Sequence, residues 1–232
     1  MANRALAHLS KFFNWLCEQD VIVASPCAGV RPPTKEQARD RILSDDEIRV
    51  LWKALDAIGG RVGAAVKVLL LTGQRRGEVI GMRRPEISGD VWSLAPSRTK
   101  NKRPHEVPLS AQVLAIIDEL PATSGDLIFA TNRTSLFHAK TAIDAQMKPT
   151  APWVMHDLRR TLASGMARLG IQLPVIEKVL NHKSGTFRGI VGVYQRHEYA
   201  AEKRDALRRW ANHGEGLVSG KPAGVVPLRI GR

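Results

Sequence analysis

The side chains best suited to chemistry in this sequence lie in short segments that are far apart along the chain. They are two arginines, a lysine, two histidines and a tyrosine, namely Arg75, Lys100, His156, Arg159, His182 and Tyr194. A planar guanidinium can donate two parallel hydrogen bonds to the oxygens of a phosphate. A phenol can act as a nucleophile when neighbouring cations ease its ionisation. Such a set could hold a phosphodiester while the phenol oxygen attacks it, and this chemistry requires neither a metal ion nor a nucleotide cofactor.

The arginines and histidines lie where the local sequence predicts how they are presented. Arg75 lies within Thr72–Glu78, where one expected helix has ended and another begins. His156 and Arg159 are separated by one helical turn, so one face of a helix can present both side chains. His182 follows the expected end of another helix. Taken alone, His156 could be a buried structural histidine, and His182 could serve only to bind helix carbonyls.

The candidate lysine and the candidate tyrosine each have one nearby competitor in the sequence. Lys100 lies in a basic turn between two expected strands, and an ammonium can protonate a departing oxygen. Lys102 competes with Lys100, because the sequence leaves the register of the turn open. The chain has only two tyrosines, Tyr194 and Tyr199. We expect Tyr194 to be the nucleophile and Tyr199 to pack on the helix that follows it.

The charge of the chain favours a polyanionic partner. Its 232 residues include 35 Lys and Arg against 22 Asp and Glu, a net charge of +13, and such a surplus favours phosphate contacts and counterion release. Apolar runs such as Val66–Leu71 are too short to span a bilayer, which needs ~20 residues, so nucleic acid is expected rather than a membrane. Cys17 and Cys27 are too few for a disulfide framework, and no Cys/His spacing suggests a metal site. Without a secretory signal, a cytoplasmic location is expected.

Apolar periodicity predicts a mainly helical chain with a small antiparallel β-sheet, an α+β fold. A helix with an aromatic face is expected at 4–17, and Ser44–Glu47 reads as a capping box that opens the main domain. Ser97–Pro104, the basic loop, separates two expected strands. Further elements are expected as helices at 62–72, 77–82, after Ser110, at 135–147, 156–169, 174–180 and 190–212, and as strands at 91–94 and 105–109.

The order and context of these segments resemble the tyrosine recombinase (phage integrase) family. The segments are Thr72-Gly73-Gln74-Arg75-Arg76-Gly77-Glu78, Lys100 within its basic turn, His156-Asp157-Leu158-Arg159, Leu180-Asn181-His182, and Tyr194. The likeness extends from the first helix to about Trp210. Each segment alone is a weak signal, but all five in this order are a strong one.

The resemblance implies roles for the candidate residues. The two arginines, Arg75 and Arg159, would hold the scissile phosphate, with His156 and His182 as hydrogen-bond donors or proton carriers. Tyr194 would attack, leaving a 3′-phosphotyrosyl link, while Lys100 protonates the leaving 5′-oxygen. Within the first motif Glu78 would orient neighbouring groups. The distance along the chain from His182 to Tyr194 is longer than in some members of the family.

The resemblance also implies a division into domains. Residues 1–31 resemble the last helix of the core-binding domain and the start of a linker, and residues 32–43 continue the linker. Residues 44–213 would form the catalytic domain, with the family's catalytic fold, and residues 214–232 a C-terminal tail. The earlier helices of the core-binding domain are not in this sequence, so a truncated chain or an isolated catalytic portion is expected. The apolar stretch Val225–Leu228 could dock on a neighbouring copy and gate Tyr194.

The expected function is therefore site-specific recombination of DNA, as used in integration or excision of mobile DNA. The expected partner is double-stranded DNA, on which four copies act together, and the chain could be a monomer in its absence. No membrane partner and no cofactor is expected. Two alternatives stay open. One is a type IB topoisomerase, which shares the chemistry but acts as a monomer. The other is a degenerate, integrase-derived protein that binds DNA without cutting it.

Overall fold

The structure, a computed structural model, describes residues 2–35, 39–149, 151–182 and 198–220. The chain divides into two compact units, Met1–Arg39 and Asp40–Arg232. Tyr194 and the stretch Val225–Leu228 lie outside the described residues. The proposals made for them from the sequence therefore stay predictions.

The first unit is one helix and the irregular segment that follows it. Helix α1 (Ala2–Glu18) confirms the helix expected at 4–17. The segment after it returns to the start of the helix, where Asn3 Nδ2 donates to the Thr34 carbonyl at 2.7 Å. Phe12 and Trp15 stack with ring centroids 6.4 Å apart, and each is about half exposed. Cys17 and Cys27 are free thiols.

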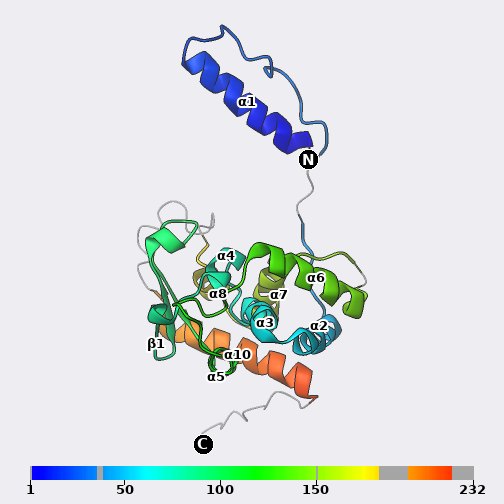
Figure 1. Ribbon diagram of the computed structural model, residues 1–232, viewed down its shortest axis with the longest axis vertical. Coiled ribbons are helices and arrows are strands. Elements are labelled where there is room, and N and C mark those ends of the chain that lie inside the picture. Colours follow the sequence, from blue (N-terminus) through cyan, green and yellow to red (C-terminus); the bar gives the residue numbers. More distant parts are fainter. Residues whose placement is uncertain (1, 36–38, 150, 183–197, 221–232) are drawn as a thin grey trace, which may run out of the picture. The chain divides into compact units, whose positions relative to one another are not determined.

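The second unit is mainly helical with one small antiparallel sheet, as the sequence predicted (Figure 1). Its described helices are α2 (Asp45–Ile58), α3 (Gly60–Thr72), α4 (Arg76–Ile80), α5 (Ala111–Asp118), α6 (Arg133–Met147), α7 (Met155–Arg168), α8 (Leu173–Val179) and α10 (Ala200–Ser219). The strands are β1 (Ile87–Ser88), β2 (Val91–Leu94) and β3 (His105–Pro108), in the order β1-β2-β3. Short 3-10 turns cover Arg84–Glu86 and Pro96–Arg98. None of the helices in the described ranges is long and apolar enough to cross a bilayer.

Helix α3 forms the centre of the second unit. Its sequence is apolar on nearly all sides, and every residue from Gly63 to Thr72 except Lys67 is buried. A helix that is apolar all round must be surrounded by other elements. Helices α2, α5, α6, α7 and α10 pack against it, and Figure 1 shows α2 and α7 next to α3, with α10 running along one side of the unit. The C-terminus of α3 is thereby fixed, and the first sequence motif begins there.

Helices α7 and α10 approach each other closely at a glycine. A Cβ on Gly165 of α7 would lie 2.1 Å from the ring of Trp210 on α10, so only glycine allows this contact. Trp210 is almost fully buried, and its indole N–H donates to the Leu70 carbonyl of α3 at 2.9 Å. Trp210 therefore links α10 to α3 and to α7, the helix that carries His156 and Arg159.

Two features of the second unit differ from the prediction. Strand β1 was not expected, because a two-residue strand has no recognisable period; Ile87 pairs with Trp92 of β2. The last helix was expected at 190–212, but residues 198 and 199 are not helical, and α10 begins at Ala200 and continues to Ser219, within the predicted tail. Gly214 and Leu217 keep its inner face packed, and Arg49 Nε donates to the Leu217 carbonyl at 3.1 Å. Tertiary packing thus overrides the weak helix preference of the glycines there.

Candidate functional site

Arg159 is the most deeply buried cation of the candidate set. It lies on the first turns of α7 and is 3% exposed. Its Nη1 donates to the Gly73 carbonyl at 2.6 Å, and its Nη2 donates to the Leu180 carbonyl. Gly73 and Leu180 are the C-caps of α3 and α8. The negative ends of two helix dipoles therefore stabilise the buried guanidinium.

Burial destabilises the charged form of the Arg159 guanidinium. Burial, and next the nearby Arg75, lower the pKa of Arg159 to about 10. The guanidinium is still charged near neutral pH, because a pKa of about 10 leaves it almost wholly protonated. Among the described residues, none forms an ion pair with it. A bound anion would supply the missing counter-charge.

Arg75 lies at the start of α4 and faces the same helix end. It is the N-cap of α4, and its backbone N–H donates to Glu78 Oε2 at 2.9 Å. Its guanidinium pairs with Glu78 Oε1 at 2.9 Å, and Nη2 donates to the Asn181 carbonyl at 3.4 Å. Glu78 is nearly buried, so it orients Arg75 as the sequence suggested. We call Arg75 and Arg159 together the arginine clamp.

The sharp turn between α3 and α4 brings the clamp together. Gly73 has φ +64°, and a Cβ there would lie 3.0 to 3.2 Å from the side chains of Leu162 and Leu180. Glycine meets both demands, a left-handed backbone and a close approach. The buried Gln74 then donates through Nε2 to the Thr72 and Val179 carbonyls, each at 2.9 Å. Its Oε1 has no hydrogen-bond partner among the described residues.

His182 follows α8 in a geometry that the backbone determines. Asn181 has φ +48°, the His182 N–H donates to the Glu177 carbonyl at 3.0 Å, and the Asn181 N–H donates to the Lys178 carbonyl. This is a Schellman motif, in which Asn can take the left-handed position. Burial, and next Arg159, lower the pKa of His182, although Glu177 opposes the shift. The imidazole is therefore mostly neutral at pH 7.

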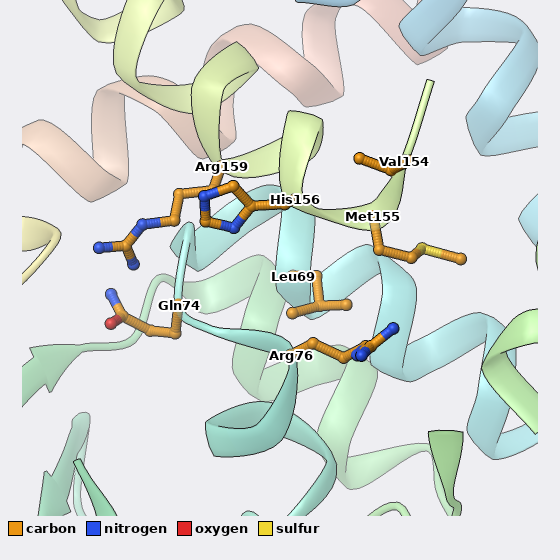
Figure 2. A pocket seen from close by; sticks show the side chains of 7 residues that line it. All are labelled: Leu69, Gln74, Arg76, Val154, Met155, His156 and Arg159. Carbon is orange, nitrogen blue, oxygen red and sulfur yellow. The ribbon is translucent and has the colours of Figure 1, made fainter. Parts of the chain in front are cut away.

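His156 lies one turn before Arg159 on α7. Burial, and then Arg160 and Arg159, lower its pKa. It lines a cavity of about 280 Å³ together with Arg159, Gln74 and Arg76. Figure 2 shows the His156 ring alongside the Arg159 side chain, across from Gln74 and Arg76 of the segment after α3. A neutral imidazole beside two guanidinium groups can accept a proton or donate a hydrogen bond.

The basic loop reaches this site through a neighbour of Lys100. Asn101 Nδ2 donates to the Asn181 carbonyl at 3.0 Å and to Asn181 Oδ1 at 2.7 Å. Lys100 and Lys102 flank Asn101 and are both exposed. The structure thus brings the loop to the end of α8, beside the arginine clamp. It leaves the choice between the two lysines open.

The structure describes Tyr199 but not Tyr194. Tyr194 lies outside the described residues, so its approach to the clamp is a prediction. Tyr199 precedes α10 with φ +50°, and its partly buried side chain packs against the core. Helix α10, which follows both, is held against α3 and α7 by Trp210.

Sequence reasoning missed residues that hold the site together. His105 of β3 is buried, and its Nε2 lies 3.1 Å from the Val179 carbonyl, which also accepts from Gln74. Asn101 and Asn181 join the basic loop to α8. An asparagine after a helix is a known C-terminal signal, so Asn181 could have been found. No sequence pattern marked Asn101 or Gln74 as structural partners of this helix end. In the described part of the chain, no cluster of His, Cys, Asp and Glu could hold a metal ion.

Comparisons with known proteins find tyrosine recombinases and integrases. The chain is 26% identical over 202 residues to tyrosine recombinase XerC of Yersinia pestis, and the aligned region covers 78% of this chain and 64% of that protein. The chain therefore spans less than two thirds of the length of that relative. A lambda integrase dimer bound to a COC′ core site superposes with a TM-score of 0.65 at 20% identity, over 81% of this chain and 73% of that chain. A lambda integrase tetramer bound to a Holliday junction superposes with a TM-score of 0.64 at 19% identity, over 79% of this chain and 59% of that chain.

A family model extends this likeness across most of the second unit. Residues 41–200 match the phage integrase family. The match includes both arginines of the clamp, both histidines, the basic loop and Tyr194. Because the model covers more than half of the chain, it establishes the relationship: this chain belongs to the phage integrase family.

Proposed function

We propose that this chain is a site-specific DNA recombinase that cleaves and rejoins DNA through a 3′-phosphotyrosyl intermediate. The observation that carries the proposal is the convergence of two guanidinium groups at the ends of α3 and α8. One of them is buried without a carboxylate partner among the described residues. Such a clamp suits an anion with several acceptor oxygens, as in a phosphodiester.

In the proposed cleavage step, the Tyr194 oxygen attacks the scissile phosphorus. A P–O bond to Tyr194 forms, the P–O5′ bond breaks, and the 3′ end stays attached to the enzyme. The phenolic proton passes to a neutral base, for which His156 is suited by its lowered pKa. Lys100 gives a proton to the departing 5′-oxygen. A 5′-hydroxyl from a partner duplex then reverses these steps and restores the phosphodiester.

The arginine clamp would act on the charge of the transition state. Two guanidinium groups in fixed positions stabilise the extra negative charge on the phosphoryl oxygens without reorganising. His182, held by the Schellman motif, would add a hydrogen bond. Because energy is conserved in the phosphotyrosine, neither a nucleotide nor a metal ion is needed in this scheme.

We also propose double-stranded DNA as the partner, with four copies acting on two duplexes. The net charge of +13 supports a polyanionic partner. The lambda integrase structures, one with a core site and one with a Holliday junction, support such an assembly by analogy of fold. In this scheme residues 44–213 are the catalytic domain, residues 1–31 end a core-binding domain, residues 32–43 complete the linker, and residues 214–232 include a tail.

Covalent trapping tests the proposal. Binding sites are first selected from a randomised duplex library, and a nick is then placed near the cleavage position so that the released strand diffuses away. We expect a covalent protein–DNA adduct that forms in EDTA, disappears in Tyr194→Phe and persists in Tyr199→Phe. Salt-sensitive binding without any adduct would instead support a DNA-binding protein without cleavage activity.

A second assay separates recombination from topoisomerase activity. A recombinase exchanges strands between two sites, whereas a type IB topoisomerase relaxes a supercoiled plasmid that carries none. We expect exchange between paired sites and relaxation that depends on a site. Rapid relaxation of a plasmid without a site would favour the topoisomerase.

A further inference from the structure

The basic loop is built around two anchored side chains. Thr99 is 5% exposed, and its hydroxyl donates to the Arg103 carbonyl at 2.7 Å and accepts from the Arg103 N–H at 3.1 Å. Asn101 Oδ1 also accepts from the Arg103 N–H, at 3.3 Å. Thr99 thus closes the loop on itself, and Asn101 supplies its hydrogen bonds to Asn181, whereas Arg98 ties the start of the loop to Glu86 and to the Gly81 carbonyl. Lys100 lies between Thr99 and Asn101.

Asn181 joins three parts of the site. Its carbonyl accepts from Arg75 Nη2 at 3.4 Å and from Asn101 Nδ2 at 3.0 Å. Its side chain exchanges hydrogen bonds with Asn101, at 2.7 Å in one direction and 3.3 Å in the other. His182 is the next residue. A displacement of Asn101 would therefore move the loop relative to Arg75 and His182 together.

We propose that Asn101 is a positioning residue that sets Lys100 against the leaving oxygen. The inference rests on the proposed function. A general acid must lie within about 3 Å of the oxygen that it protonates. An exposed lysine on a loop has many rotamers, and ordering its backbone reduces the conformations that miss the oxygen. The reciprocal amide bonds between Asn101 and Asn181 provide that order at the position next to Lys100.

The experiment compares two DNA substrates that differ in one atom. In the first the scissile phosphate has its normal 5′-bridging oxygen, and in the second a sulfur replaces it. A thiolate leaves without a proton, since a thiol has a pKa of about 8.5, so the sulfur substrate removes the need for a general acid. The variants are Asn101→Ala, Asn101→Asp, Lys100→Ala, Lys102→Ala and, as a matched control, the exposed Asn212→Ala. Asn101→Asp keeps the Oδ1 acceptor for Arg103 and loses the Nδ2 donor to Asn181.

On the oxygen substrate, Lys100→Ala should lower the cleavage rate about 10²- to 10⁴-fold, the usual contribution of a general acid. Both Asn101 variants should lose about 10- to 10²-fold, because a small misplacement of a catalytic group can cost that much. On the sulfur substrate, Lys100→Ala, Asn101→Ala and Asn101→Asp should cleave at rates within about threefold of wild type, because a thiolate leaves without needing a general acid. Adding Asn101→Ala to Lys100→Ala should lower the rate no further. Lys102→Ala and Asn212→Ala should cleave both substrates like wild type.

Several results would overturn the inference. Asn101 variants that stay slow on the sulfur substrate would have a general structural defect, which a comparison of thermal unfolding with wild type would reveal. Asn101 variants that cleave the oxygen substrate normally would have no role. If the sulfur substrate restores cleavage by Lys102→Ala and not by Lys100→Ala, the general acid is Lys102. If wild type forms no adduct with either substrate, the proposed function fails, and this inference with it.

Discussion

The arginine clamp and the basic loop are held in place by different kinds of contact. Arg159 of the clamp is almost fully buried and is bound by backbone carbonyls at the ends of two helices, and Arg75 is held by the buried Glu78 and by the Asn181 carbonyl. The loop is exposed at Lys100 and is bound through side chains, those of Arg98, Thr99 and Asn101. Groups that hold charge throughout the reaction thus belong to the core. The group expected to give up a proton belongs to a segment that can adjust.

The largest effect should come from breaking the clamp. Arg159→Ala should lower the rate of covalent adduct formation about 10³-fold, as for the loss of a preorganised donor to a developing charge. The change also leaves the Gly73 and Leu180 carbonyls without this donor. The matched control is Arg168→Ala on the same helix, which removes only a partly exposed pair with Asp45. Equal losses in the two variants, measured by trapping kinetics, would contradict a special role for Arg159.

A substitution that loosens the core behind the clamp should act on stability. Gly165→Ala places a Cβ 2.1 Å from Trp210, and overpacking of this kind should lower the free energy of unfolding by about 3 kcal/mol. Gly77→Ala in α4 is the control, because nothing lies within 4 Å of its added Cβ. That control should be unchanged or slightly more stable. Urea unfolding of both variants measures the difference, and a tolerated Gly165→Ala would mean that α7 and α10 can separate.

The contact between the sheet and α8 should depend on pH. Burial, and next Lys203, lower the pKa of His105 to about 3, against 6.5 for the free side chain. Between about pH 3 and pH 6.5, the folded protein therefore keeps this imidazole neutral, whereas the imidazole of the unfolded chain binds a proton. The stability that results is fully present above pH 6.5 and is lost as the pH falls from there toward 3.

From pH 7.5 to pH 5 this linkage should lower the free energy of unfolding by about 2 kcal/mol. His105→Gln can keep the hydrogen bond to Val179 without a titrating group. The difference between wild type and this variant, followed by urea unfolding at both pH values, isolates the effect. A variant with the same pH dependence as wild type would show that His105 does not titrate in this way.

The smallest effect should come from loosening the loop alone. Thr99→Val removes the hydroxyl that bonds to Arg103, which should cost about 1 kcal/mol. Hydrogen exchange should speed up several-fold at the Arg103 amide, whereas the amides of α3 should exchange as in wild type. Faster exchange throughout α3 would mean that the loop and the core open together, and the contrast between clamp and loop would disappear.

Much of the fold could be predicted because its signals are local. The capping box at Ser44 and the cap at Ser110 are both present in the structure. The period of apolar residues placed α3 and α7 correctly, and with them Arg75, His156 and Arg159 at helix starts. The partners of Arg159 could not be predicted, since Gly73 and Leu180 contribute backbone carbonyls that carry no sequence signal. The Asn101–Asn181 contact and the extension of α10 likewise depend on tertiary packing.

The most direct test of the account is a structure of the protein with a DNA core site and vanadate at the cleavage position. Vanadate mimics the five-coordinate phosphorus of the transition state. We predict that its equatorial oxygens lie within about 3 Å of guanidinium nitrogens of both Arg75 and Arg159. The Tyr194 oxygen should occupy one axial position. A vanadate bound away from either arginine, or with another nucleophile on its axis, would contradict the account.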